Sequence, residues 1–129
     1  MSTPQRLIPI YTTRGDLGAY LAYPNLFNRS GEWIGWVTTD RSVYSVHGQY
    51  IGTLNIESTF GARILRKRAY DFNKPDRNPP TPPAPILAPA HAPLAPQMGE
   101  ISLSMLDVLD EEPELLPTLD FGEMRQDLD

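Results

Sequence analysis

The residue types that most often carry enzymatic chemistry are few and scattered in this chain of 129 residues. The two histidines are His47, at an expected hairpin tip, and His91, within a proline-rich stretch. Asp16 and Glu32 occupy equivalent tip positions and are expected on separate hairpins, too far apart for paired-carboxylate catalysis unless a closed ring brings the tips together. The absence of cysteine excludes disulfides, thiolate metal sites and cysteine nucleophiles. The sequence therefore predicts a protein that is not an enzyme and that has neither a cofactor site nor a metal site.

The densest group of cations lies in one short run and consists of Arg63, Arg66, Lys67 and Arg68. One interpretation is an edge strand whose solvated basic side chains discourage aggregation. A second is a surface that contacts anions such as phospholipid headgroups. A third is a docking site for the acidic end of the same chain, which would fold back when no partner is present. Nucleic acid is disfavoured as a partner, because the chain carries a formal net charge of −5.

The elements that position these residues belong to a repeated motif. An aromatic residue, a polar stretch ending in glycine, and returning apolar residues occur three times, with tip glycines Gly15, Gly31 and Gly48. Glycine supplies the positive φ that a short hairpin loop needs. The spacings of 16 and 17 residues fit two short strands and two turns per copy, and a degraded fourth copy follows 13 residues later at Gly61. Four hairpins in series predict an all-β fold, a small pseudo-four-fold ring or shallow barrel.

Small and aromatic residues recur at fixed positions within the motif. The fourth residue after each tip glycine is Ala19, Gly35 or Gly52, which predicts close approach of neighbouring backbones. Aromatic side chains that include Trp33 and Trp36 are expected to form the core of the barrel. An aromatic cup that binds a ligand is the alternative.

The three motifs together resemble the four-fold β-flower domains of bacteria. Each copy follows an aromatic residue with G-x-x-(Ile/Gly)-(Gly/Ala), and the resemblance covers about residues 7–68. It implies hairpins that radiate like petals from a shallow pseudo-symmetric barrel, with a suggested similarity to tubby-like, lipid-contacting barrels. It implies no catalytic residues. A weaker resemblance is to PRC-barrel domains, which share a D/S-x-x-G-x-x-I-G strand pattern but do not normally repeat it three times.

Composition changes abruptly near residue 78. Eleven of the 12 aromatic residues lie at or before Phe72, so a packed core is expected only in the first part. Residues up to 78 include ten basic and six acidic residues, and the remainder includes one basic and ten acidic residues. We therefore expect a β-hairpin repeat domain over residues 1–74, a proline-rich linker over 75–98, and an acidic, leucine-rich tail over 99–129.

The linker and the tail are expected to extend away from the β-domain. Nine of the 22 residues from Pro75 to Pro96 are proline, which predicts a semi-rigid polyproline II spacer of about 60–70 Å. Recognition by an SH3-type aromatic groove is the alternative. The tail is expected to be largely disordered, with short helices that form on a partner. Its expected partner-binding residues are apolar: Ile101, Met105, Val108, Leu109, Leu115, Leu116, Leu119 and Phe121.

The sequence thus predicts a non-enzymatic interaction or adaptor protein, in which a β-domain is tethered to an acidic tail that binds a protein partner. The alternative is binding of a lipid or an anionic membrane surface by the aromatic and basic residues of the β-domain. The N-terminal residues show neither a signal peptide nor a transmembrane pattern, so a cytoplasmic location is predicted.

Overall fold

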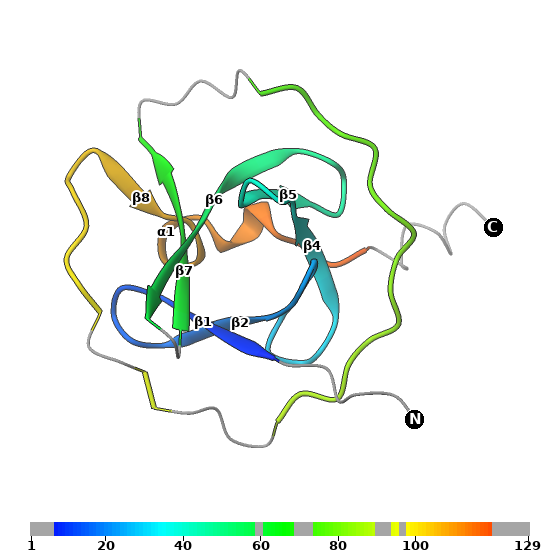
Figure 1. The fold of residues 1–129 in the computed structure, drawn as a ribbon, viewed down its shortest axis with the longest axis horizontal. Coiled ribbons are helices and arrows are strands. Elements are labelled where there is room, and N and C mark those ends of the chain that lie inside the picture. The colour runs from blue at the N-terminus through cyan, green and yellow to red at the C-terminus, as the bar shows by residue number, and fades with distance from the viewer. Residues whose placement is uncertain (1–6, 59–60, 69–73, 90–93, 96–97, 120–129) are drawn as a thin grey trace.

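The computed structural model describes residues 7–58, 61–68, 74–89, 94–95 and 98–119 and shows a closed all-β barrel (Figure 1). Its elements are β1 (Ile8–Tyr11), β2 (Leu17–Ala22), β3 (Asn25–Phe27), β4 (Trp33–Val37), β5 (Ser42–Ser45), β6 (Tyr50–Ser58), β7 (Gly61–Lys67), β8 (Met105–Asp107), α1 (Val108–Glu111) and a 3₁₀ turn (Pro113–Leu115). Consecutive strands pair antiparallel, and β1 also pairs parallel with β7 through Ile10 and Ala62. This last pairing closes seven strands into a barrel, in agreement with the predicted all-β ring or shallow barrel.

Glycine turns the tips of three hairpins, β1–β2, β3–β4 and β5–β6. Gly15, Gly31 and Gly48 each have a φ of 87°. Each glycine amide donates to the carbonyl oxygen three residues earlier, at 2.9 to 3.0 Å. Two turns link these hairpins: the first has a cis peptide bond before Pro24, and the second repeats the tip geometry with Arg41 at a φ of 67° in place of glycine. The predicted role of the three tip glycines is confirmed.

The fourth hairpin differs from the one predicted from the sequence. Gly61 does not turn a tip but begins β7, opposite Ser58, after the turn that links β6 to β7. Because tips and linking turns alternate along the chain, the fourth petal consists of β7 and β8. These strands pair from Leu65 opposite Asp107 to Lys67 opposite Met105. The acidic segment after the prolines therefore completes the pseudo-four-fold ring, whereas the sequence suggested a largely disordered tail.

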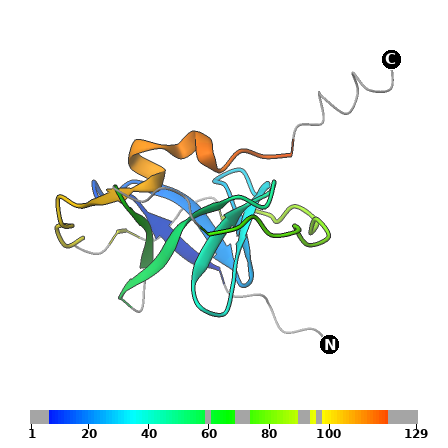
Figure 2. The ribbon, with the colours of Figure 1, turned by 90° about the horizontal axis from the view of Figure 1, so that it is seen from above.

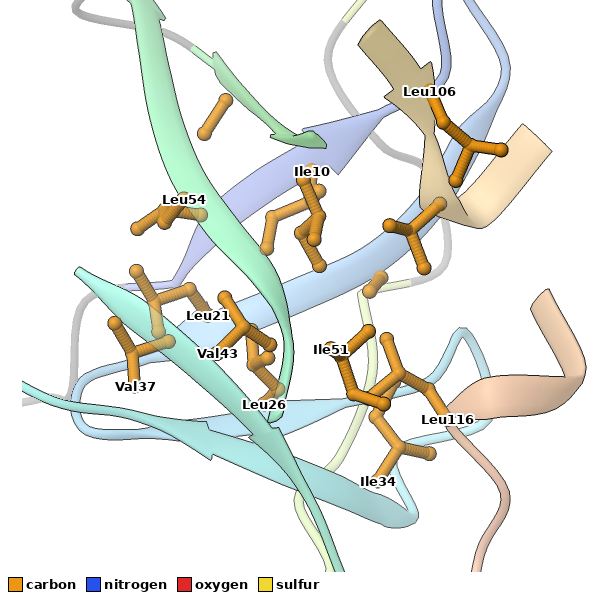
Figure 3. Packing of buried hydrophobic residues seen from close by; sticks show 14 residues of the cluster. Ile10, Leu21, Leu26, Ile34, Val37, Val43, Ile51, Leu54, Leu106 and Leu116 are labelled. Carbon is orange, nitrogen blue, oxygen red and sulfur yellow. The ribbon is translucent and has the colours of Figure 1, made fainter. Parts of the chain in front are cut away.

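The interior of the barrel is aliphatic, and the C-terminal segment closes one of its ends. Figures 2 and 3 show this segment lying across the strands, with Leu106 and Leu116 pointing into the core. Val108 is fully buried there. The buried core residues from the strands of the barrel are Ile10, Ala19, Leu21, Leu26, Ile34, Val37, Val43, Ile51, Leu54, Ala62 and Ile64.

The aromatic side chains form a second cluster on the opposite face of the strands. Trp33 and Trp36 belong to this outer cluster; they are buried core residues, as predicted, but they lie in this second cluster and not among the aliphatic residues inside the barrel. The rings of Trp36 and Tyr44 stack with centroids 5.3 Å apart. Neighbouring backbones approach closely at the small positions of the motif: a Cβ at Gly52 would lie 2.7 Å from the Leu65 carbonyl oxygen. The predicted close approach at the small positions is confirmed.

A proline-rich belt, described over residues 74–89 and 94–95, runs around the outside of the barrel instead of projecting from it (Figure 1). The Arg77 amide donates to the Gly48 carbonyl oxygen and the Ile86 amide to that of Gly31, both at 2.9 Å. Ala95 lies next to the third tip, since a Cβ at Gly15 would be 3.8 Å from its own Cβ. The belt thus meets the three tips at intervals of nine residues and in the reverse of their order along the chain. The prediction of a free spacer is wrong, because backbone amides between the prolines bind the tips.

Candidate functional site

The basic run of β7 lies beneath the C-terminal segment and is mostly occupied by it. Arg63 is 2% exposed and Arg66 is 7% exposed, whereas Lys67 and Arg68 reach the surface. The Arg63 guanidinium donates to the Thr13 hydroxyl at 3.0 Å and to the Gly99 carbonyl oxygen at 2.7 Å. Two of the four residues expected to contact an anionic surface are therefore buried by the chain itself.

Ion pairs join the acidic residues of the C-terminal segment to this basic strand and its neighbour. Arg66 lies 2.9 Å from a Glu112 carboxylate oxygen, and Arg68 lies 3.0 Å from Glu111. On the first hairpin, the Nε of Arg14 donates to Asp110 at 2.9 Å. The expected docking of the acidic segment on the basic strand is thus observed in the structure.

Asp107 is the acidic residue held most completely by the barrel, with 1% exposure. Its Oδ2 accepts hydrogen bonds from the amide and the hydroxyl of Thr13, both at 2.6 Å. Its Oδ1 accepts from the Asp110 amide at 3.4 Å and so caps α1. One side chain therefore anchors β8 to the first hairpin and begins the helix that closes the barrel.

The apolar residues expected to bind a partner are largely accounted for by the barrel. Val108 and Leu116 are buried in the inner core, and Leu109 and Leu115 pack against it. Leu119 packs against the outer aromatic cluster, and Ile101 and Met105 are half-buried. Phe121 lies outside the described residues. The sequence suggested apolar side chains without intramolecular partners, but those of the described segment have them.

Most of the belt carries no charged side chain, although it begins with Lys74, Asp76 and Arg77. From residue 78 to residue 99 the sequence contains no Lys, Arg, Asp or Glu. Pro79, Pro82 and Pro85 are all exposed, while Pro83 and Ile86 are half-buried toward the barrel. Leu87 and Leu94 are 94% and 95% exposed. A solvated loop is normally polar, so an exposed run of proline, alanine and leucine is unusual for one.

Two side chains of the belt lie on the outer aromatic cluster and fix where the belt begins. The Lys74 ammonium is 4.9 Å from the centre of the Tyr50 ring, and the Arg77 guanidinium is 5.3 Å from that of Tyr44. Lys74 also donates to the Ser42 hydroxyl at 2.8 Å. These cation–π contacts, each worth about 0.5–1 kcal/mol at exposed sites, add to the backbone bonds that hold the belt.

Two small hollows adjoin these surfaces. The first encloses about 110 Å³ between the β3–β4 tip, the belt and the end of the described chain; its lining residues are Glu32, Trp33, Pro82, Pro83, Pro85, Thr118 and Leu119. The second, of about 210 Å³, brings Tyr50 together with Arg66 and Lys67 and is also lined by Thr53, Leu65 and Met105. Binding sites for small organic ligands usually enclose about 300–1,000 Å³, so each hollow fits a single side chain or headgroup better than a substrate.

The candidate catalytic residues lie apart. His47, Asp16 and Glu32 are exposed on three separate hairpin tips, and His91 lies outside the described residues. Within the described ranges, no three histidine, aspartate or glutamate side chains come together at a distance suited to a metal ion. None of the described helices has the length and apolar character needed to cross a membrane.

Sequence reasoning missed the belt as a feature of the site. Its signal is weak but present: Arg77, Ile86 and Ala95 recur every nine residues, and the hairpin tips they meet recur every 16 or 17. A proline run has the same composition whether it projects or wraps, so only the three-dimensional positions of the tip carbonyls distinguish the two.

Comparison with known proteins accords with this architecture. The family model described as 4-fold beta flower protein matches residues 8–105, a span that includes the belt and reaches the first residue of β8. No curated protein and no solved structure matches the chain. With four petals, a closed barrel and a match over most of its length, the chain belongs to the family of 4-fold beta flower proteins.

Proposed function

We propose that this protein is a non-enzymatic interaction protein that presents its proline-rich belt to a protein partner. The observation that carries the proposal is the uncharged and largely exposed run of residues 78–89, held against the barrel by the amides of Arg77 and Ile86. Charged residues are depleted at the centres of protein interfaces, and large exposed apolar side chains favour association. Leu87, 94% exposed, stands just beyond the second of these contacts.

The spacing of the exposed prolines indicates the kind of partner. Pro79, Pro82 and Pro85 lie three residues apart, which is the repeat of a polyproline II helix, and all three face solvent. Aromatic-lined grooves in proteins recognise this arrangement. Because hydrogen bonds fix both ends of the stretch, the partner would bind a segment that has already lost most of its conformational freedom, which favours affinity.

The hollow beside the belt supports the same proposal. Trp33, Pro82 and Pro85 line a space of about 110 Å³, the size of one side chain. A partner that lies along the prolines would meet this hollow and could insert one apolar side chain into it. Interface energy is usually concentrated in a few such anchored residues.

The geometry favours the belt over the acidic segment as the partner-binding surface. The acidic segment uses Leu106, Val108 and Leu116 to fill the barrel. Releasing the segment would expose these side chains and the apolar core residues that they cover. Removing an apolar side chain from a core costs about 2–5 kcal/mol. The belt, in contrast, offers its outer prolines and leucines without any rearrangement.

Affinity capture with charge-substituted chains tests this proposal. The double variant Pro82→Glu/Leu87→Glu changes two exposed belt residues and leaves the Arg77 and Ile86 amides in place. The matched control, Tyr23→Glu, changes a 54% exposed aromatic residue on a linking turn. We expect a specific protein partner to be lost from the belt variant and retained by the control. Retention of every interactor by the belt variant would refute the proposal.

A second candidate function is binding of an anionic lipid headgroup. What supports it is the hollow of about 210 Å³ in which Tyr50 adjoins Lys67. Flotation with anionic vesicles, run beside the capture experiment, separates the two functions. Vesicle binding that survives the belt substitutions would favour the lipid candidate.

A further inference from the structure

The hollow beside the belt, of about 110 Å³, combines apolar walls with a single carboxylate. Of the described residues that line it, only Glu32 is charged; the others are Trp33, Pro82, Pro83, Pro85, Thr118 and Leu119. Trp33 is 6% exposed and its indole nitrogen is buried, so this side chain presents apolar surface rather than a hydrogen-bond donor to an occupant. The hollow therefore offers one negative charge beside an apolar space.

Hydrogen bonds hold Glu32 on its hairpin tip. The Asn28 Nδ2 donates to Glu32 Oε1 at 3.3 Å, and the Glu32 amide donates to the Asn28 side-chain oxygen at 3.0 Å. Among the described residues, no Lys, Arg or His forms an ion pair with Glu32, and this includes Arg29 on the same tip. The carboxylate thus carries a charge that the described part of the chain does not neutralise.

The walls of the hollow are fixed by the contact between the belt and the same tip. The Ile86 amide donates to the Gly31 carbonyl oxygen at 2.9 Å, and these two residues directly adjoin Pro85 and Glu32. Ile86 also packs against the outer aromatic cluster to which Trp33 belongs. The hollow thus exists before a partner binds, and an entering side chain does not have to order it.

A lysine or arginine side chain matches this combination of surfaces. Such a side chain has an apolar stem, which packs along apolar surface, and a cation, which stays in water or meets a carboxylate. A wholly apolar side chain would cover Glu32 and leave its charge without a partner, which costs free energy. An acidic side chain would be repelled by the same carboxylate.

We propose that the protein that binds the belt inserts a lysine or arginine side chain into this hollow, with the cation at Glu32 and the stem against Trp33 and the prolines. Because the hollow lies along the belt, this role of Glu32 depends on the proposed function, and it specifies the chemistry of the partner's anchoring residue. An ion pair at one fixed position also sets the register of the partner along the prolines.

Peptide selection on the full-length protein tests this role with a defined probe, a library of random peptides displayed on phage. Wild type is compared with Glu32→Gln, Glu32→Lys and the control Asp16→Asn. Glutamine retains a side-chain oxygen for Asn28, so the tip keeps its hydrogen bonds. Asp16 is exposed and follows Gly15 as Glu32 follows Gly31, but it is not among the residues that line the hollow.

We expect wild type and Asp16→Asn to enrich lysine or arginine at one position of the selected peptides. Glu32→Gln should lose this preference, and Glu32→Lys should favour an acidic residue there. A peptide selected on wild type should bind Glu32→Gln about two- to five-fold more weakly, the range for a partly exposed ion pair, and should shift the NMR resonances of Trp33. The proposal is overturned if wild type shows no basic preference, if Glu32→Gln keeps that preference, or if the Trp33 resonances do not move.

The capture experiment with the belt variant separates this proposal from the proposed function. If Pro82→Glu/Leu87→Glu loses a partner while the basic preference does not depend on Glu32, the belt binds a protein and the role of Glu32 is refuted. If the preference depends on Glu32 while the belt variant keeps every interactor, the hollow is a site for a cationic side chain and the proposed function is refuted.

Discussion

Thr13 connects two buried charges that lie far apart in the sequence. Its hydroxyl accepts a hydrogen bond from Arg63 and donates one to Asp107, whose side chains are 2% and 1% exposed. An ion removed from water costs several kcal/mol unless it is well hydrogen-bonded, so the bridge adds to the Gly99 carbonyl that holds Arg63 and to the backbone amides that hold Asp107. The first hairpin, the basic strand and the C-terminal segment are therefore joined at a single residue.

Asp40 gives a residue-scale prediction for the pH dependence of stability. Hydrogen bonds from the Thr38 hydroxyl and the Ser42 amide, with Lys74 nearby, lower the pKa of this carboxyl group from 3.8 to about 2. A lowered pKa stabilises the folded state above the unfolded-state value, and this contribution is lost as pH falls from about 4 toward 2. We expect Asp40→Asn to lower the urea midpoint near neutral pH, with the difference from wild type shrinking across that window.

The control for Asp40 is Asp16→Asn, which removes one exposed carboxylate from a different turn. Urea titrations at several pH values, followed by tryptophan fluorescence, measure both variants against wild type. If the Asp40→Asn difference is the same at low pH as near neutrality, the stabilising role of the ionised carboxylate is wrong.

At the scale of elements, the belt and the hairpin tips form one structure. Each tip that a belt amide binds contains a glycine whose missing side chain lets the belt backbone approach. A Cβ at Gly31 would overlap the Ile86 carbonyl oxygen, and one at Gly48 would overlap that of Arg77. Gly15 has the same φ of 87°, but among the described residues a Cβ there would meet only the Cβ of Ala95, at 3.8 Å. Comparing a substitution at Gly31 with the same substitution at Gly15 therefore separates the cost of a positive φ from the cost of displacing the belt.

We predict that Gly31→Ala destabilises the protein more than Gly15→Ala. Both substitutions place a side chain at positive φ, at a cost of about 1–2 kcal/mol. Gly31→Ala must also displace the belt, an overpacking cost of about 1–3 kcal/mol more. The free energies of urea unfolding, compared at one temperature and pH, measure the difference. Equal losses would mean that the belt yields freely and contributes little to the fold.

At the scale of the whole molecule, the barrel is completed by segments that follow its first seven strands. Leu106, Val108 and Leu116 supply part of the inner core, and β8 supplies half of the fourth petal. We predict that a chain ending at residue 74 shows no cooperative urea transition. A chain ending at residue 119 retains every described contact and serves as the control. A sharp transition of the shorter chain near the midpoint of the full-length protein would show that the first seven strands fold alone.

What the sequence predicts and what it misses follow from the range of the interactions involved. Gly15, Gly31 and Gly48 are identifiable because a short hairpin loop requires positive φ locally. The three-residue strand β8 cannot be identified in this way, because Leu106 pairs with Arg66, 40 residues earlier. The residue pattern of β8 is also too short to indicate a strand. The sequence also does not predict which buried residues lie inside the barrel and which lie on its outer face, because aromatic and aliphatic side chains at alternating positions suit either face of a closed sheet. Local turns are thus readable from the sequence, whereas long-range closure is not.

The belt also changes which parts of the chain are free to vary in length. A loop attached only at its two ends accepts insertions easily, because the entropy of closure rises slowly with length. The belt is hydrogen-bonded to tips at Arg77 and Ile86 and lies beside a third tip at Ala95, and the distances between those points are set by the circumference of the barrel. One residue added between two contacts moves every later contact out of place. The segment with the least regular secondary structure is therefore a segment whose length the fold itself specifies.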